Sequence, residues 1–251
     1  MQIVLLTALG VGGATVIGAI AGFIFKKISH RWSDIVLSFA AGVMLSAAVL
    51  GLILPSLEYG GKYGIIATAA GIFAGALCLS FIDKLVPHLH RIAGVVEGGN
   101  AQKSDVSRVM LFVLAIAIHN LPEGIAAGVG FGTGNNSEAV TIALGIALQN
   151  IPEGMVIIGP MLGAGISPRR TFALASVTGA VEVVGTFLGY FAVSISQAIL
   201  PFALAFAGGT MLYVISDEMI PETHSHGHEK AATYALLVGF TFMLALDVII
   251  G

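Results

Sequence analysis

The sequence predicts an all-α membrane protein, a bundle of eight transmembrane helices. Of its 251 residues, 57% are hydrophobic and only 10% are charged, whereas soluble domains carry roughly a quarter charged residues. Eight apolar runs of about 20 residues are each long enough to cross a hydrocarbon core of about 30 Å as a helix. We expect helices at 2–25, 35–57, 64–83, 107–131, 139–164, 172–194, 202–220 and 231–250.

The segments between these runs indicate one domain over residues 1–251. Most are short and polar, and only the segment 84–106 is long. Orientation follows from the positive-inside rule, because ten of the eleven lysines and arginines fall in segments on one side of the predicted bundle and Lys62 alone falls on the other. We therefore expect a multi-pass protein of the cell (inner) membrane with both termini outside and the 84–106 loop in the cytoplasm.

Charge and cysteine content exclude several classes of partner and of bond. The formal net charge is -3, and no basic patch with interleaved aromatic residues occurs, so we expect no nucleic-acid partner. Cys78 is the only cysteine, so no intrachain disulfide can form. Because Cys78 lies in an apolar run, we expect a buried, inert thiol. The lipid bilayer is the partner that the composition requires.

Two similar hexapeptides lie near the middle of two apolar runs. His-Asn-Leu-Pro-Glu-Gly occupies 119–124, and Gln-Asn-Ile-Pro-Glu-Gly occupies 149–154. Side chains three and four residues apart project from one face of a helix. The polar side chains of each hexapeptide should therefore converge, namely His119, Asn120 and Glu123 in the first and Gln149, Asn150 and Glu153 in the second.

These polar residues lie close to the middle of the membrane. At helical rise, His119 lies roughly 18 Å from the cytoplasmic end of its helix, and Gln149 roughly 15 Å from the outer end of the next. Glu182 lies roughly 15 Å from the cytoplasmic end of the 172–194 helix. Carboxylates at that depth are costly unless a cation or a proton neutralises them. Imidazole, amide and carboxylate without thiolate suit Zn²⁺, Fe²⁺, Mn²⁺ or Cd²⁺ as the bound and transported ion.

Each hexapeptide also contains a proline directly before its glutamate. Pro122 and Pro152 each remove a backbone hydrogen bond and free the carbonyl four residues earlier. Bent helices with freed carbonyls at mid-membrane are tolerated where they line a polar cavity, and transporters use such breaks at binding sites. We therefore expect the proline-bent fourth and fifth helices, 107–131 and 139–164, to lie at the core of the bundle.

The paired hexapeptides resemble the signature of the Zrt/Irt-like (ZIP) family of divalent metal transporters, in particular its GufA-like bacterial branch. The resemblance extends over the whole chain and implies import of metal ions into the cytoplasm, with a homodimer as a possible assembly. It implies a binuclear centre in which Glu123 and Glu153 bridge two ions. His119 and Gln149 would complete the first set of ligands, and the second set would also contain Asn120, Asn150 and Glu182.

The resemblance also concerns two further positions, Met44 and Asn150. Met44 matches a family position near the outer entrance to the centre. Asn150 stands where some relatives carry aspartate, and an amide at that position lowers the charge of the second site.

Polar residues at the cytoplasmic end of the 202–220 helix indicate an exit route. Alternating histidines suit weak, exchanging metal contacts. The residues of this predicted pathway are Asp217, Glu218, Glu222, His224, His226 and His228.

Three alternatives to metal import remain open from the residues alone. Spacing does not encode direction, so a metal exporter fits the same pattern. An intramembrane zinc enzyme is disfavoured because the His-Glu-x-x-His string of zinc peptidases is absent, so we expect no enzyme. A proton-coupled transporter of organic solutes would use the glutamates as relays but would leave the histidine and amides unexplained.

Overall fold

The computed structural model describes residues 1–25, 29–92 and 101–250, without side-chain detail at 83, 85–92, 101–105, 107 and 108. Within these residues eight helical spans are long and apolar enough to cross a membrane, and no β-strand occurs. The predicted all-α bundle of eight spans is therefore confirmed. The spans are Gln2–Ile24, His30–Tyr59, Gly61–Ile82, Val109–Thr133, Asn136–Gly163, Pro168–Ile195, Gln197–Thr223 and Glu229–Ile250.

Several spans consist of more than one element. The helices are α1 (Gln2–Ile24), α2 (His30–Ser46), α3 (Leu54–Tyr59), α4 (Gly64–Ile92), α5 (Ala101–Gly130), α6 (Asn136–Gly163), α7 (Pro168–Ile195), α8 (Leu200–Val214), α9 (Ile220–Thr223) and α10 (Glu229–Ile250). Two π-helical turns, η1 (Ala47–Ile53) and η5 (Ile215–Met219), join α2 to α3 and α8 to α9. Short 3₁₀ turns cover Gly61–Tyr63, Phe131–Thr133 and Gln197–Ile199.

The predicted long loop at 84–106 is largely helical at both ends. α4 continues to Ile92 and α5 begins at Ala101, and only 93–100 lies outside the described residues. The difference arises because apolar runs mark the membrane boundary, whereas a helix can continue into water, where its polar side chains are solvated.

The two π turns were not predicted, and each is followed by a proline. Pro55 and Pro221 lack an N–H and therefore leave the carbonyl four residues earlier without its usual partner. In response the backbone bonds across five residues, from the Leu54 amide to the Val49 carbonyl in η1. The same spacing joins Ile220 to Ile215 in η5. The extra residue in each turn changes which side chains face the bundle interior.

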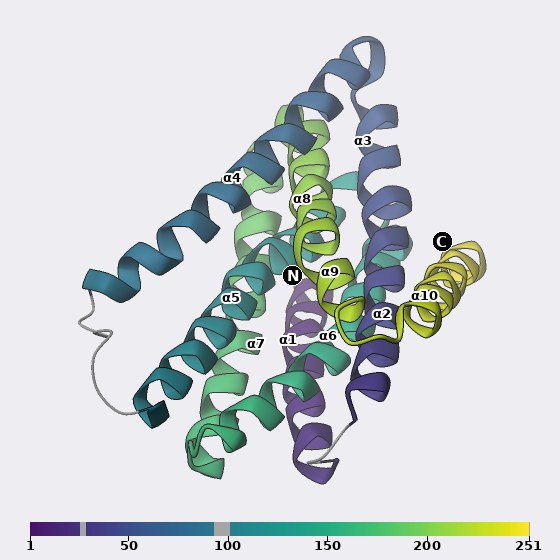
Figure 1. The fold of residues 1–251 in the computed structure, drawn as a ribbon. Coiled ribbons are helices and arrows are strands. Elements are labelled where there is room, and N and C mark those ends of the chain that lie inside the picture. The colour runs from purple at the N-terminus through teal and green to yellow at the C-terminus, as the bar shows by residue number, and fades with distance from the viewer. Residues whose placement is uncertain (26–28, 93–100, 251) are drawn as a thin grey trace.

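The helices pack in two groups (Figure 1). In the first group α1, α5, α6 and α7 pack against one another, chiefly through the pairs α5–α7, α1–α6 and α1–α7. In the second group α4 packs on α8, and α10 packs on α2. A buried apolar cluster that includes Val11, Met44, Ala127, Ile146 and Met211 lies between the groups. α5 and α6 belong to the first group and face the second along this seam.

The glycine that ends each hexapeptide lets two helices approach closely. A Cβ atom at Gly124 would lie 2.2 Å from the backbone oxygen of Glu182 on α7. A Cβ at Gly154 would lie 2.1 Å from the backbone oxygen of Thr15 on α1. Such distances are well inside van der Waals contact, so only glycine permits this packing. The hexapeptides therefore set the spacing of the first helix group.

One residue does not lie where the sequence predicted it. Cys78 is exposed, not buried. α4 packs on α8 through Gly71 and Gly75, whose Cβ atoms would collide with the α8 backbone. Cys78 lies on another side of α4 and faces outward, and because lipid solvates apolar side chains, an apolar run alone does not reveal which of its residues are buried.

Candidate metal centre

The two hexapeptides face each other from the middle of α5 and α6, and Glu182 joins them from α7. The carboxyl group of Glu123 lies within electrostatic range of Glu153 and Glu182 and beside the amide of Gln149. Glu153 in turn lies within electrostatic range of His119. All seven predicted ligand residues are thus gathered into one polar cluster inside the bundle. All of them are buried except Glu153, which is half-buried.

Glu182 accepts hydrogen bonds at both of its carboxylate oxygens. Oε1 accepts from the Thr15 hydroxyl at 2.7 Å and from Asn120 Nδ2 at 2.6 Å. Oε2 accepts a short hydrogen bond from Asn150 Nδ2. Glu182 and Thr15 are both fully buried. Neutral donors therefore surround this carboxylate inside the first helix group.

Glu123 has the opposite environment. The side chain is only 1% exposed, and among the described residues no hydrogen bond of good geometry reaches either oxygen, although the Gln149 amide lies beside them. The same holds for both polar atoms of the Gln149 amide and for the Oδ1 atoms of Asn120 and Asn150. Buried polar atoms in native proteins are nearly always paired. Most of these unpaired atoms are acceptor oxygens, which a cation would satisfy.

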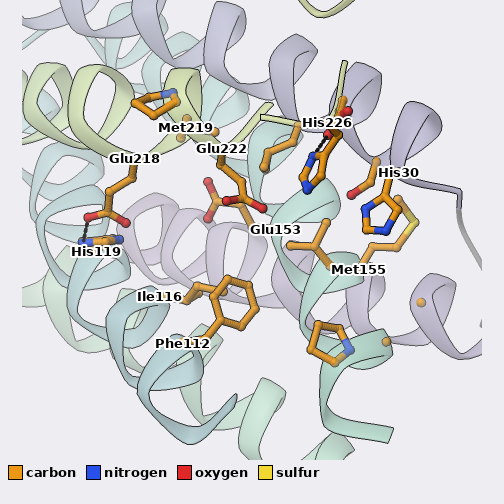
Figure 2. Close-up of a pocket in the computed structure, with 18 of the residues that line it drawn as sticks. His30, Phe112, Ile116, His119, Glu153, Met155, Glu218, Met219, Glu222 and His226 are labelled. Carbon is orange, nitrogen blue, oxygen red and sulfur yellow. Dashed lines mark hydrogen bonds and ion pairs between the residues drawn. The ribbon is translucent and has the colours of Figure 1, made fainter. Parts of the chain in front are cut away.

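His119 marks the point where the first helix group meets the second. Its Nε2 atom lies 2.9 Å from Oε1 of Glu218, as the dashed line in Figure 2 marks. Glu218 belongs to the π turn η5, so the unpredicted turn supplies the partner of a predicted ligand. Glu153 lies within electrostatic range of both His119 and Glu218.

A cavity of about 840 Å³ reaches His119 and Glu153 from one end of the bundle. It is lined near the centre by Phe112, Ile116 and Glu218 and farther out by residues where α1 ends, α2 begins and α9 ends. Figure 2 shows Glu153 and Glu222 between the His119 end and the His226 end of this cavity. The centre is therefore reached from the end of the bundle where the predicted pathway residues lie.

Two residues at the mouth of the cavity were missed by the sequence analysis. Asp34, which is 3% exposed, accepts a contact of 3.0 Å at Oδ1 from Nδ1 of His226. The ring of His30 stacks on that of His226, with 4.6 Å between centroids. The sequence analysis placed both His30 and Asp34 in the polar segment between the first two predicted helices. The signal available was an aspartate and a histidine spaced by four residues, beside an apolar run.

The other predicted pathway residues divide into those that line the cavity and those that do not. Asp217, Glu218, Glu222 and His226 line it. His224 instead contacts the Ile220 carbonyl through Nδ1 at 2.8 Å and Thr233 through Nε2 at 3.2 Å. His228 and Met44 are not among the residues that line the cavity.

Two observations concern the residues that could hold a metal ion, namely the position of Met44 and the number of ionisable side chains that lie together. Met44 is fully buried in the apolar cluster between the helix groups. Counting only His, Cys, Asp and Glu, the described part of the chain contains no group of three arranged to hold a metal ion. A complete set of ligands at the centre therefore requires amide oxygens as well, and the two hexapeptides supply three amides.

Known proteins resemble this chain over nearly its whole length. The family model described as ZIP Zinc transporter matches residues 96–247. The zinc transporter GufA of Myxococcus xanthus is 39% identical, with 98% of each chain covered. The zinc transporter ZIPB of Bordetella bronchiseptica is 37% identical over 95% of this chain and 78% of its own, and the zinc transporter ZIP11 of Homo sapiens is 32% identical over 95% and 94%.

These relatives are transporters and not enzymes. The family match includes both hexapeptides, Glu182 and the π turn that carries Glu218. The predicted resemblance is thereby confirmed: the chain belongs to the ZIP family of zinc transporters.

Proposed function

We propose that this protein carries divalent metal cations, zinc above all, across the cell membrane into the cytoplasm. The observation that carries the proposal is the environment of Glu123, a buried carboxylate that lies within electrostatic range of the carboxylates of Glu153 and Glu182. A charge in that position is costly inside a membrane unless a cation meets it. The named relatives, all zinc transporters, support zinc as the ion.

The ion is held at mid-membrane between α5 and α6. Its ligands are the imidazole of His119, the amide oxygen of Gln149 and the carboxylates of Glu123 and Glu153. This donor set contains no thiolate, which suits Zn²⁺ and also Cd²⁺, Fe²⁺ or Mn²⁺. The absence of thiolate ligands also keeps affinity moderate, and transport needs moderate affinity because the ion must leave again.

Import is the direction that the family resemblance implies, and the cavity opens toward the side that we predict to be cytoplasmic. Its mouth lies where α1 ends and α2 begins, and lysines and arginines concentrate on that side of the predicted topology. That side is the cytoplasm, and both termini lie outside. Outward of the centre, Met44 is buried in packed apolar side chains. Together with the predicted topology, these features support a state that is open to the cytoplasm.

The His119–Glu218 pair would compete with a metal ion for one ligand atom. Nε2 of His119, an atom through which a metal would bind, instead faces Glu218 at 2.9 Å. An ion leaving the centre passes Asp217, Glu218, Glu222 and His226, which line the cavity. These carboxylates and the imidazole offer single, exchangeable contacts along the way.

Alternating access would arise from movement of one helix group against the other. His119 belongs to the first group and Glu218 to the second, so this pair would break and re-form as the seam opens. The first group is bound together by backbone contacts at Gly124 and Gly154, which favours its movement as one body. Rocking of packed helix groups about a fixed site is a common transporter mechanism.

Zinc uptake into proteoliposomes tests the proposal. The double variant Glu123→Ala, Glu153→Ala should abolish zinc uptake, because it removes both carboxylates that neutralise the ion. A matched double variant at two exposed glutamates, Glu58→Ala and Glu229→Ala, should retain uptake. Full zinc flux in the first variant would overturn the site. Zinc movement only from the cytoplasmic face of the protein to its outer face would indicate export.

A further inference from the structure

We propose that Glu182 does not bind metal in this chain but acts as a positioning residue for a centre that holds one ion. It does so through a hydrogen-bonded cluster, here termed the clasp, formed by Thr15, Asn120, Asn150 and Glu182. This inference rests on the proposed metal site between α5 and α6, and it replaces the two-ion centre that family resemblance implies.

The Glu182 carboxylate does not need a cation, because the protein itself supplies its hydrogen-bond donors. Thr15 and Asn120 donate to Oε1, and Asn150 donates to Oε2. An ionised carboxylate is an acceptor only, and three donors on two oxygens suit that form. Hydrogen bonds to a charged group are the strong ones, and they compensate the cost of burial. Glu123, by contrast, accepts no hydrogen bond of good geometry from the described residues and has only the Gln149 amide beside it.

Hydrogen bonds also fix the orientation of the two asparagine amides. Asn120 Nδ2 donates both to Glu182 and to the Thr178 carbonyl at 3.1 Å. Asn150 Nδ2 donates both to Glu182 and to the Val11 carbonyl at 3.1 Å. An amide nitrogen carries two N–H groups, so both are used.

Because the amide group is planar, two donated N–H bonds fix its orientation. The Oδ1 atoms of Asn120 and Asn150 are acceptors and take no part in the bonds to Glu182. Both are buried and lack a partner among the described residues. Glu182 thus fixes two amides so that their oxygens are available to an ion, while its own oxygens are not.

The identity of residue 150 decides whether the centre needs a second ion. Asn150 can donate to Glu182 because it carries N–H groups. An aspartate at this position would have none, and it would place a second carboxylate in contact with Glu182. Two buried carboxylates in contact require a cation or a proton between them. The amide at 150 therefore removes the reason for a second ion, and an acid there would restore it.

The clasp takes one side chain from each helix of the first group. Thr15 lies on α1, Asn120 on α5, Asn150 on α6 and Glu182 on α7. Four neighbouring helices are thereby tied to a single carboxylate. A change at Thr15 or Glu182 should alter the geometry of the amide oxygens without removing either amide.

Counting bound zinc in detergent-purified protein tests the inference. The number of ions at the centre is the difference between the wild type and the Glu123→Ala, Glu153→Ala variant, which subtracts ions on the loop histidines. We expect a difference of one. Glu182→Gln should leave the count at one and weaken affinity about 10–100-fold, the usual cost of removing a group that orients ligands. Asn150→Asp should raise the count to two.

Thr15 offers a variant distant from any ligand role. Thr15→Val keeps the side-chain shape but removes the hydroxyl, so zinc affinity should fall at least several-fold, and Thr15→Ser should restore it. A purely structural role would lower the thermal midpoint of Thr15→Val and leave its zinc affinity unchanged, which would overturn the inference.

The outcomes separate this inference from the proposed function. A difference of two ions in the wild type that falls to one in Glu182→Gln would make Glu182 a ligand and overturn the clasp, while the metal site itself would stand. A difference of zero would overturn both, because the centre would then hold no ion.

Discussion

Two glutamates buried side by side in the centre differ in what surrounds their oxygens. Glu182 accepts three hydrogen bonds, whereas Glu123 accepts none of good geometry from the described residues. At the scale of single residues, this difference assigns their roles. Glu182 is satisfied by the protein itself, and Glu123 is the carboxylate that needs an ion.

Glu123→Gln should therefore separate metal binding from folding. The glutamine keeps the shape of the side chain but removes the charge that attracts the ion. Removing a group that only orients a ligand costs about 10–100-fold in metal affinity, and loss of a ligand should cost at least as much. In a thermal unfolding assay, zinc at 100 times the wild-type Kd should stabilise the wild type by about 2.7 kcal/mol and this variant far less.

Glu58→Gln is the matched control for this change. It makes the same substitution at an exposed glutamate with no assigned role, so it should keep the full stabilisation by zinc. Equal stabilisation of Glu123→Gln and wild type would contradict the ligand role of Glu123.

Protons should compete with the metal at the same side chains. A histidine ligand must be neutral and a glutamate ligand ionised to bind a cation, so metal affinity falls in acid. At zinc concentrations below saturation, uptake into proteoliposomes should decline as the pH falls from about 7 to about 5, because protons then compete with the ion for its ligands. Raising the zinc concentration should restore the rate, and uptake that is faster in acid would contradict simple competition.

Much of the candidate centre could be predicted from the residues. Helical spacing brought His119, Asn120 and Glu123 to one face because i, i+3 and i+4 positions always share a face. Thr15 and Asp34 could not be predicted, because their partners, Glu182 and His226, lie more than 160 residues away in the chain. Single polar residues in apolar runs carry no sign of a partner so distant.

At the scale of helices, prolines and glycines decide how the centre is framed. Pro221 follows the π turn that turns Glu218 toward His119. The sequence marked a helix break at Pro221 but not a π turn, because both begin with the same missing N–H. Gly124 and Gly154 set the distances between α5 and α7 and between α6 and α1. Four-residue glycine spacing predicts close contact but does not name the helix that is contacted.

Gly124→Ala should disturb the centre through the backbone. Its methyl group would lie 2.2 Å from the Glu182 carbonyl oxygen, so α5 and α7 must separate. Overpacking of this kind costs about 1–3 kcal/mol, and the shift should also weaken zinc binding because Asn120 and Glu182 would move apart. Thermal unfolding and a zinc titration on the same sample measure both effects.

Gly13→Ala is the matched control on the neighbouring helix α1. A Cβ at Gly13 would meet no atom within 4 Å, so this change should leave zinc affinity intact and stabilise the helix by about 0.5–1 kcal/mol. Equal loss of zinc binding in both variants would mean that the close approach at Gly124 does not matter.

At the scale of the whole molecule, the eight spans could be predicted because a bilayer requires runs of fixed length and apolar composition. Their pairing could not, since every span is apolar on all sides and lipid does not drive one face inward. The two helix groups and the cavity between them became visible only in three dimensions. The cavity reaches the centre from the end of the bundle where the predicted pathway residues lie.

Labelling of single cysteines tests this topology. With Cys78→Ser as background, Ser225→Cys in the exposed loop before α10 should react with a membrane-impermeant maleimide only from the cytoplasmic side. Lys62→Cys should react only from outside. The two positions serve as controls for each other, and labelling of both from the same side would contradict the eight-span arrangement.

Anomalous diffraction from crystals soaked in cadmium tests the central claim most directly, since cadmium suits the same imidazole, amide and carboxylate ligands as zinc. We predict a strong anomalous peak between α5 and α6, within bonding distance of Glu123 and Glu153 and absent from the Glu123→Ala, Glu153→Ala variant. Crystals in which cadmium occupies only the loop histidines, with these two glutamates apart and no peak between them, would contradict the account.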